Sequence, residues 1–306
     1  MRTWLLALAV SACAMHAEAA NDLSKKVWQH GSEDCAKNQD PAIEVFEFDA
    51  DTYILRQNKC VHFEAPFIYV LFGDQTVFVQ DTGATADPVR FPLYDVIQRL
   101  VAQRNNPALK VLVAHTHSHS DHTAADAQFR GKPGVTLVEP NAAAVREHFG
   151  FTSWPAGIAT VDLGRRILKV IPAPGHQDEA IVVHDSRTGW LLTGDNVYPG
   201  RLVVSNWPEY RSSIERLVEF SKTHPISAVL GTHIEMSASG KLFAPGSTFQ
   251  PDEAPLPLTV DDLRKLSERL AQAAAPTTIP MASFVVSPAG ALQRTLGKVL
   301  KWLGVR

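Results

Sequence analysis

The sequence has few cysteines, no large excess of charge of either sign, and no long apolar run beyond its first twenty residues. Its 306 residues include three cysteines, carry a formal net charge of −3 at pH 7 and are 45% hydrophobic. Nucleic-acid-binding proteins usually carry an excess of basic residues, and this chain has no such excess, so we expect no nucleic-acid partner. The shortness of the later apolar runs excludes a stable membrane span. The chain is long enough to bury a sizeable core, and no particular oligomeric state is predicted.

The first nineteen residues have the features of a secretory signal peptide. Arg2 gives a positive start, residues 4–10 are apolar, and residues 17–19 (Ala-Glu-Ala) offer a small-x-small cleavage site. We therefore expect a secreted or periplasmic protein. Residues 10–13 (Val-Ser-Ala-Cys) also resemble a bacterial lipoprotein cleavage box, and in that alternative Cys13 would carry a lipid.

Two cysteines remain after this leader, Cys35 and Cys60. An even number in an oxidising compartment favours a disulfide. Such a bond would close a loop of about 25 residues and stabilise the fold by roughly 3 kcal/mol. Two unpaired thiols are the alternative, and neither cysteine has the spacing of a metal site.

The most informative segment is residues 117–122, His-Ser-His-Ser-Asp-His, which supplies four metal-binding side chains within six residues. It follows a short apolar run at residues 110–114 that predicts a buried strand. In an extended segment, side chains two apart point the same way, so His117 and His119 can share one ion. The adjacent Asp121 and His122 point differently, which suits a neighbouring ion.

Three further candidates each stand at the end of an apolar run, namely His176, Asp195 and His233. With residues 117–122 they make five imidazoles and two carboxylates. This nitrogen and oxygen set suits zinc, and it is large enough for two Zn²⁺ ions per chain. A solvated histidine-rich loop is the alternative, and the placement of the three later residues argues against it.

These residues resemble the metallo-β-lactamase superfamily. The resemblance includes residues 81–83 (Asp-Thr-Gly) after an apolar run, and it extends over about residues 44–240. It implies an α/β fold, an αββα sandwich of two facing mixed β-sheets flanked by helices. It also implies a ligand assignment: His117, His119 and His176 for one metal, Asp121, His122 and His233 for the other, and Asp195 as the bridge. His115 is an extra histidine with no ligand role.

The chemistry that follows is hydrolysis of a small carbonyl substrate. Two close cations lower the pKa of a bound water, and the resulting hydroxide attacks a carbonyl carbon. Asp121 is the candidate catalytic residue that orients this hydroxide. Tyr198 lies three residues after Asp195, and the same offset carries a tyrosine in homoserine-lactone lactonases; this implies that its hydroxyl faces the substrate oxyanion. Packing is the alternative role for this tyrosine.

An aspartate at position 195 is typical of the family's thioesterases, lactonases and phosphodiesterases. We therefore expect a lactone, an ester or a thioester as substrate. The alternatives are a β-lactamase, an iron-dependent redox enzyme, and a non-catalytic binding protein on the same fold. Residues 177–179 and Glu235 are candidates for tuning the metal ligands from outside.

We divide the chain into the signal peptide (1–19), a metallo-β-lactamase-like domain (20–240), and a C-terminal loop and helical extension (241–306). Residues 240–258 are rich in Pro, Gly and Ser, and Thr259 precedes a predicted helix. The last fifteen residues predict a basic amphipathic helix that packs on its own domain or lies on an anionic membrane. Apolar periodicity predicts strands at 43–48, 52–55, 67–72, 76–79, 110–114, 135–138, 167–171, 180–184, 190–193 and 228–230, and helices at 93–104, 123–129, 141–148 and 209–222.

Overall fold

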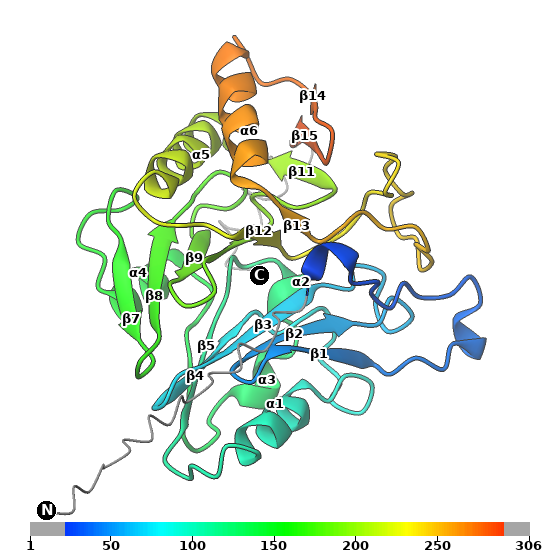
Figure 1. Cartoon of the computed structure of the whole chain (residues 1–306), viewed down its shortest axis with the longest axis vertical. Helices are drawn as coiled ribbons and strands as arrows, with labels where there is room; N and C mark the ends of the chain where they lie inside the picture. Colours follow the sequence, from blue (N-terminus) through cyan, green and yellow to red (C-terminus); the bar gives the residue numbers. More distant parts are fainter. Residues whose placement is uncertain (1–21, 291–306) are drawn as a thin grey trace, which may run out of the picture.

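The computed structural model describes residues 22–290, which form two six-stranded sheets packed face to face with helices on the outer faces (Figure 1). The predicted leader, Cys13 and the basic C-terminal helix lie outside the described residues. Within the described part of the chain, no helix combines the length and apolar character needed to cross a bilayer.

The first sheet has the strand order β1-β2-β3-β4-β5-β6. Its strands are β1 (Ile43–Asp49), β2 (Thr52–Gln57), β3 (Phe67–Phe72), β4 (Thr76–Gln80), β5 (Lys110–Ala114) and β6 (Val135–Leu137). The first four strands pair antiparallel, while β5 pairs parallel with both of its neighbours.

The second sheet has the strand order β13-β12-β10-β9-β8-β7. Its strands are β7 (Ala159–Asp162), β8 (Ile167–Pro172), β9 (Ile181–Asp185), β10 (Trp190–Gly194), β12 (Ala228–Gly231) and β13 (Pro257–Leu258). A third, small sheet joins β11 (Arg201–Val204), β15 (Val285–Pro288) and β14 (Ile279–Pro280) in that order.

Six helices and two short 3-10 helices complete the described elements. They are η1 (Leu23–Lys25), η2 (Cys35–Lys37), α1 (Leu93–Ala102), α2 (Ser120–Thr123), α3 (Asp126–Phe129), α4 (Ala142–Phe149), α5 (Trp207–Ser221) and α6 (Val260–Gln272). Side chains cap the start of two helices: Asn141 caps α4, and Thr259 forms a capping box with Asp262 at the start of α6.

Alternate residues of β3 face two different apolar layers, which is why this strand is buried along its whole length. Tyr69 and Leu71 pack between the two sheets, whereas Ile68 and Val70 pack under α1 and α3. A third layer lies between the second sheet and the helices α5 and α6, where Leu191 and Val229 are buried. The three layers confirm the predicted αββα sandwich.

The ends of four strands, β5, β8, β10 and β12, bring the candidate ligands to one edge of the sandwich, and β4 ends at the same edge. Strands β4 and β5 run parallel. Strands β8, β10 and β12 also run in one direction, because β8 and β10 both pair antiparallel with β9 and β10 pairs parallel with β12. The chain leaves these strands at their carboxyl ends, and the polar loops that follow meet there.

The helix predicted at residues 123–129 is wrong in its bounds, because the chain forms two short helices, α2 and α3, instead. Thr82 N donates to the His122 carbonyl (2.7 Å), and Ala124 N donates to the Gly83 carbonyl (3.0 Å). These bonds to the segment after β4 replace those that one continuous helix would make. Tertiary contacts therefore override local helix propensity here.

Several short strands were not predicted, namely β7, β11, β13, β14 and β15. Three of them belong to residues 241–290: β13 extends the second sheet beside β12, and β14 and β15 join β11. The C-terminal extension therefore contains strands as well as a loop and a helix. The boundary at residue 240 stays a prediction.

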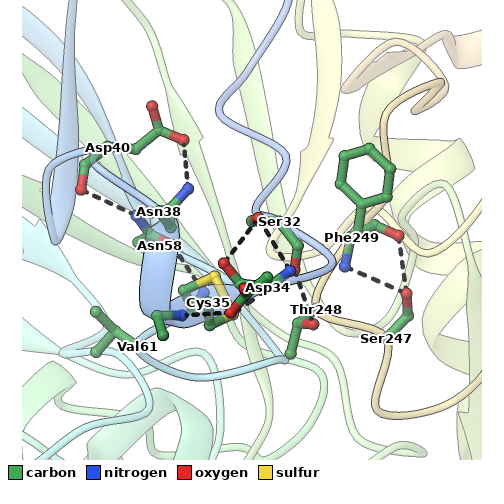
Figure 2. The surroundings of a disulfide bond; sticks show 12 residues. Ser32, Asp34, Cys35, Asn38, Asp40, Asn58, Val61, Ser247, Thr248 and Phe249 are labelled. Atoms are coloured by element: carbon green, nitrogen blue, oxygen red, sulfur yellow. Dashed lines mark hydrogen bonds between the residues drawn. A yellow bond between two sulfur atoms is a disulfide. The ribbon is translucent and has the colours of Figure 1, made fainter.

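The predicted disulfide is confirmed, because Cys35 and Cys60 are bonded. Figure 2 shows this bond beside a contact between the N-terminal segment and the loop before β13, where Ser32 N donates to the Thr248 carbonyl (3.0 Å). On the Cys60 side, the Asn58 side chain accepts from Cys60 N (2.7 Å). The disulfide thus fastens the N-terminal segment to the loop between β2 and β3.

Candidate metal centre

The first group of candidate ligands comes from the loop after β5 and the turn after β8, with Asp195 after β10. The Nδ1 atom of His119 lies 2.9 Å from Nε2 of His117 and 3.0 Å from Nε2 of His176. Asp195 Oδ2 lies 3.9 Å from Nε2 of His117 and 3.7 Å from Nε2 of His176. Ligands of a tetrahedral zinc ion with bonds of 2.0–2.1 Å are about 3.3 Å apart, so this spacing fits one ion.

The second group surrounds the other oxygen of Asp195. Nε2 of His122 and Nε2 of His233 each lie 3.4 Å from Asp195 Oδ1. The same two nitrogens lie 3.4 and 3.3 Å from Asp121 Oδ2. These four side chains again have the spacing of ligands around one ion.

Asp195 belongs to both groups, and its two oxygens face different ones. Its Oδ1 atom is buried and receives no hydrogen bond from the described residues, although two imidazole nitrogens lie near it. A buried carboxylate oxygen without a partner is costly unless a ligand satisfies it. The donor set and this oxygen therefore fit a pair of divalent cations.

Main-chain carbonyls hold the outer nitrogens of two ligand imidazoles. Nδ1 of His176 lies 2.7 Å from the Val203 carbonyl, and Nδ1 of His233 lies 3.1 Å from the Glu64 carbonyl. A carbonyl can only accept, so each Nδ1 carries a proton and each Nε2 is the ring atom that faces the centre. These two imidazoles are held in the tautomer that a metal ligand requires.

A buried network around Asp81 orients two more imidazoles, those of His117 and His122. Asp81 Oδ2 lies 3.0 Å from Nδ1 of His122, and its Oδ1 accepts from Thr116 N (2.7 Å). The Thr116 hydroxyl contacts Asp81 and lies 3.1 Å from Nδ1 of His117. The Asp-Thr-Gly segment after β4 thus supports ligands that come from the loop after β5.

Burial keeps two imidazoles of the first group, His117 and His119, uncharged. It lowers the pKa of His117 well below its ordinary value, and the neighbouring His122 adds to this effect. Burial and the nearby His176 lower the pKa of His119 to about 4. These imidazoles are therefore neutral near pH 7, as metal binding requires.

The two imidazoles of the second group, His122 and His233, are instead favoured in their protonated, charged form. Burial opposes the charged form of His233, but the carboxylates of Asp195 and Asp121 outweigh it and raise its pKa to about 9. For His122, burial is likewise outweighed by the carboxylates of Asp121 and Asp195, and its pKa is raised well above its ordinary value. A metal ion entering this group would have to displace protons, so its binding should be coupled to proton release.

The structure brings together all seven predicted ligands and excludes His115. The imidazole of His115 contacts Asp126 (2.8 Å), a carboxylate that also accepts from the Thr82 hydroxyl (2.8 Å). His115 belongs to neither group, as the sequence predicts.

Tyr198 lies next to the centre through its ring, which packs on His233 with ring centroids 5.5 Å apart. Its hydroxyl lies 2.6 Å from the Arg201 carbonyl and 3.1 Å from Glu235 Oε2, and the side chain is buried. The catalytic role predicted for Tyr198 stays a prediction, and the hydroxyl already has hydrogen-bond partners.

Several groups that support the candidate ligands were not predicted from the sequence. The carbonyls of Glu64 and Val203 give no signal in a sequence, because any residue could supply them. Glu179, one of the residues considered for outer tuning, accepts from Ser118 N (3.1 Å). Thr116 could have been found from its position directly before His117.

Comparisons with known proteins show which family the chain resembles. A model of the metallo-beta-lactamase superfamily matches residues 63–233. The chain is 27% identical over 217 residues to the acyl-coenzyme A thioesterase MBLAC2 of Bos taurus, covering 60% of this chain and 77% of that protein. It is 27% identical over 136 residues to a hydroxyacylglutathione hydrolase of Chelativorans sp. (strain BNC1), covering 44% of this chain and 51% of that protein.

Among solved structures, a metallo-beta-lactamase from Pontibacter korlensis covers 76% of this chain and 100% of its own, with a TM-score of 0.49 and 18% identity. The family model spans more than half of the chain and includes the segment from the loop before β3 to His233. The chain therefore belongs to the metallo-beta-lactamase superfamily.

Proposed function

We propose that the protein is a binuclear zinc hydrolase that cleaves a small acyl substrate, with a thioester as the favoured class. The observation that carries this proposal is Asp195, whose two oxygens face two separate groups of ligands. One carboxylate shared in this way suits two neighbouring cations, and the histidine-rich donor set suits Zn²⁺.

Two divalent ions held by these groups would supply a water of lowered pKa and a positive charge that polarises an acyl carbonyl. The protein contributes position and exclusion of water. His117, His122 and His233 are almost fully buried, which keeps the ligand nitrogens in a low-dielectric surrounding.

Asp121 is the group we assign to proton handling. Its side chain is 18% exposed, against 10% for Asp195, so it is the more accessible of the two carboxylates. It can accept a hydrogen bond from the attacking water and pass a proton to the leaving group. Hydrolysis of an acyl group needs both actions.

The relatives favour sulfur as the leaving atom. One is named as an acyl-coenzyme A thioesterase and the other as a hydroxyacylglutathione hydrolase, and both names describe acyl groups carried on a thiol. Lactones and oxygen esters present the same carbonyl carbon and remain alternatives within the same mechanism.

We also propose that the protein acts outside the cytoplasm. The features of residues 1–19 support export, and the Cys35–Cys60 disulfide supports an oxidising compartment. A lipid on Cys13 is the alternative form of the exported protein.

The test is metal analysis of the purified mature chain with an assay against thioesters, lactones, phosphodiesters and β-lactams. We expect about two zinc ions per chain and turnover of thioesters. Asp121→Ala should abolish turnover, whereas Asp95→Ala, which removes an exposed carboxylate on α1, should not. A chain that binds no metal, or turnover that survives Asp121→Ala, would contradict the proposal.

A further inference from the structure

The side chain of Gln177 contacts the outer ring nitrogen of His119, one of the five candidate ligand imidazoles. The amide nitrogen of Gln177 lies 2.6 Å from Nε2 of His119. The opposite ring nitrogen, Nδ1, faces His117 and His176 and is therefore the ligand atom. Gln177 thus stands on the far side of the ring from the metal position.

This contact decides the tautomer of His119. A neutral imidazole that offers its Nδ1 lone pair to a metal carries its proton on Nε2, and that proton needs an acceptor. A glutamine amide has an oxygen at one end, and a 180° rotation of the amide exchanges the oxygen and the nitrogen. The nitrogen faces Nε2 in the structure; once the amide is rotated so that Oε1 faces Nε2, Gln177 accepts the proton and directs the lone pair of Nδ1 toward the first group.

The main chain fixes the position of Gln177. Its carbonyl accepts from Gly175 N (3.3 Å) and from Ala180 N (3.4 Å), which closes the turn between β8 and β9. His176 occupies the same turn. One tight turn therefore supplies a ligand and also holds the side chain that orients another ligand.

We infer that Gln177 is a positioning residue for the first metal group, acting through His119. This inference rests on the metal site of the proposed function. The other ligand imidazoles are oriented by main-chain carbonyls or by the buried network of Asp81 and Thr116. The His119 contact is made by a half-buried side chain, so it can be removed without disturbing the backbone.

The experiment measures zinc affinity of the full mature chain by competition with a chelator. Gln177→Leu keeps the bulk but removes the acceptor, and Gln177→Asn keeps the amide but shortens its reach. Both should weaken the binding of the zinc ion in the first group by roughly 10- to 100-fold, the range typical for loss of such outer partners. Gln177→Glu keeps an acceptor at the same reach and should stay within about threefold of the native affinity. Gln272→Leu, at an exposed position at the end of α6, is the matched control and should not change the affinity.

A second measurement distinguishes a change in the orientation of the His119 ring from a general loss of stability. In zinc-loaded protein labelled with ¹⁵N-histidine, the His119 ring should show a proton on Nε2 that exchanges slowly with water. Exchange should be fast in Gln177→Leu and slow again in Gln177→Glu. Thermal unfolding of the metal-free forms should be the same in all variants.

Two outcomes would overturn the inference. Native affinity and slow exchange in Gln177→Leu would show that Gln177 does not position His119, while the proposed function would stand. A native chain that binds no zinc would overturn both. The assay uses zinc alone, so an incorrect substrate class leaves its result unaffected.

Discussion

The two ends of the sandwich both bury charged side chains between the sheets, but only one end balances them. At the end opposite the candidate metal centre, Arg166 is 1% exposed and binds Asp185 through two nitrogens, at 3.0 and 2.6 Å. It also donates to the Asp51 carbonyl (2.7 Å) and to the Thr52 hydroxyl (3.1 Å) of the first sheet. This cluster joins the two sheets and leaves no charge uncompensated.

At the end that holds the candidate metal centre, the buried charges are not balanced in this way. Asp195 Oδ1 has no hydrogen bond among the described residues, and neutral and protonated imidazoles stand side by side. Such an arrangement costs stability in a metal-free chain. The Arg166 cluster is therefore complete as a structural link, whereas the Asp195 cluster has the arrangement of a ligand-binding site.

The largest effect is expected at the shared carboxylate. Asp195→Asn removes the charge that both groups use, so we expect the metal content to fall and kcat/KM to drop by about 10⁴-fold, or about 5 kcal/mol. Metal analysis and the thioester assay check this. Full metal content and near-native turnover would show that the two groups do not depend on Asp195.

The next largest effect is expected for the Arg166–Asp185 ion pair at the opposite end of the sandwich. Asp185→Asn leaves Arg166 buried with a weakened partner, so we expect the free energy of unfolding to fall by about 3–5 kcal/mol. Urea unfolding measures this loss, and the folded fraction should keep its metal. A loss below about 1 kcal/mol would contradict the structural role of the pair.

A third buried charge is only partly compensated. Lys59 is 2% exposed, and its amine lies 3.9 Å from Glu253, whose two oxygens already accept from Arg56. Burial, helped by the Arg56 charge, lowers the Lys59 pKa from 10.5 to about 8. Because the folded pKa lies below the unfolded one, the cost is complete below pH 8 and disappears as the pH rises toward 10.5.

Lys59→Met should therefore stabilise the chain by about 3 kcal/mol at pH 7 and by much less at pH 9.5. Urea unfolding at the two pH values checks the sign. Lys110→Met, at an exposed position at the start of β5, is the control and should show no such pH dependence. A destabilised Lys59→Met variant at pH 7 would show that its contact with the Phe63 carbonyl outweighs the cost of burial.

The smallest effect is expected at Tyr198. Its hydroxyl bonds to the Arg201 carbonyl, so Tyr198→Phe should cost about 1 kcal/mol of stability and slow turnover less than tenfold. Unfolding and steady-state kinetics measure both. If turnover instead slowed by about two orders of magnitude while stability stayed unchanged, the oxyanion role predicted from the sequence would be supported.

The candidate ligands that the structure brings together could be named from the sequence, because each lies in or directly after a local pattern. His117 to His122 form one compact motif, and His176, Asp195 and His233 each follow an apolar strand. The strands β3 and β5 were predicted with their observed bounds for the same reason, since both are short apolar runs.

Elements that depend on distant partners could not be predicted. Strand β11 has four residues and pairs with β15, which lies more than 80 residues later. The Arg166–Asp185 pair and the Glu64 carbonyl beside His233 also exist only once the two sheets meet. Local patterns therefore predict the candidate ligands, while the contacts that orient these side chains arise from the tertiary fold.

The most direct test of the central claim is the number of metal ions bound per folded chain, measured in parallel for the native protein and for Asp195→Asn. The shared carboxylate predicts about two ions in the native chain and fewer in the variant. A native chain that binds none, or a variant that binds as many as the native chain, would contradict the account.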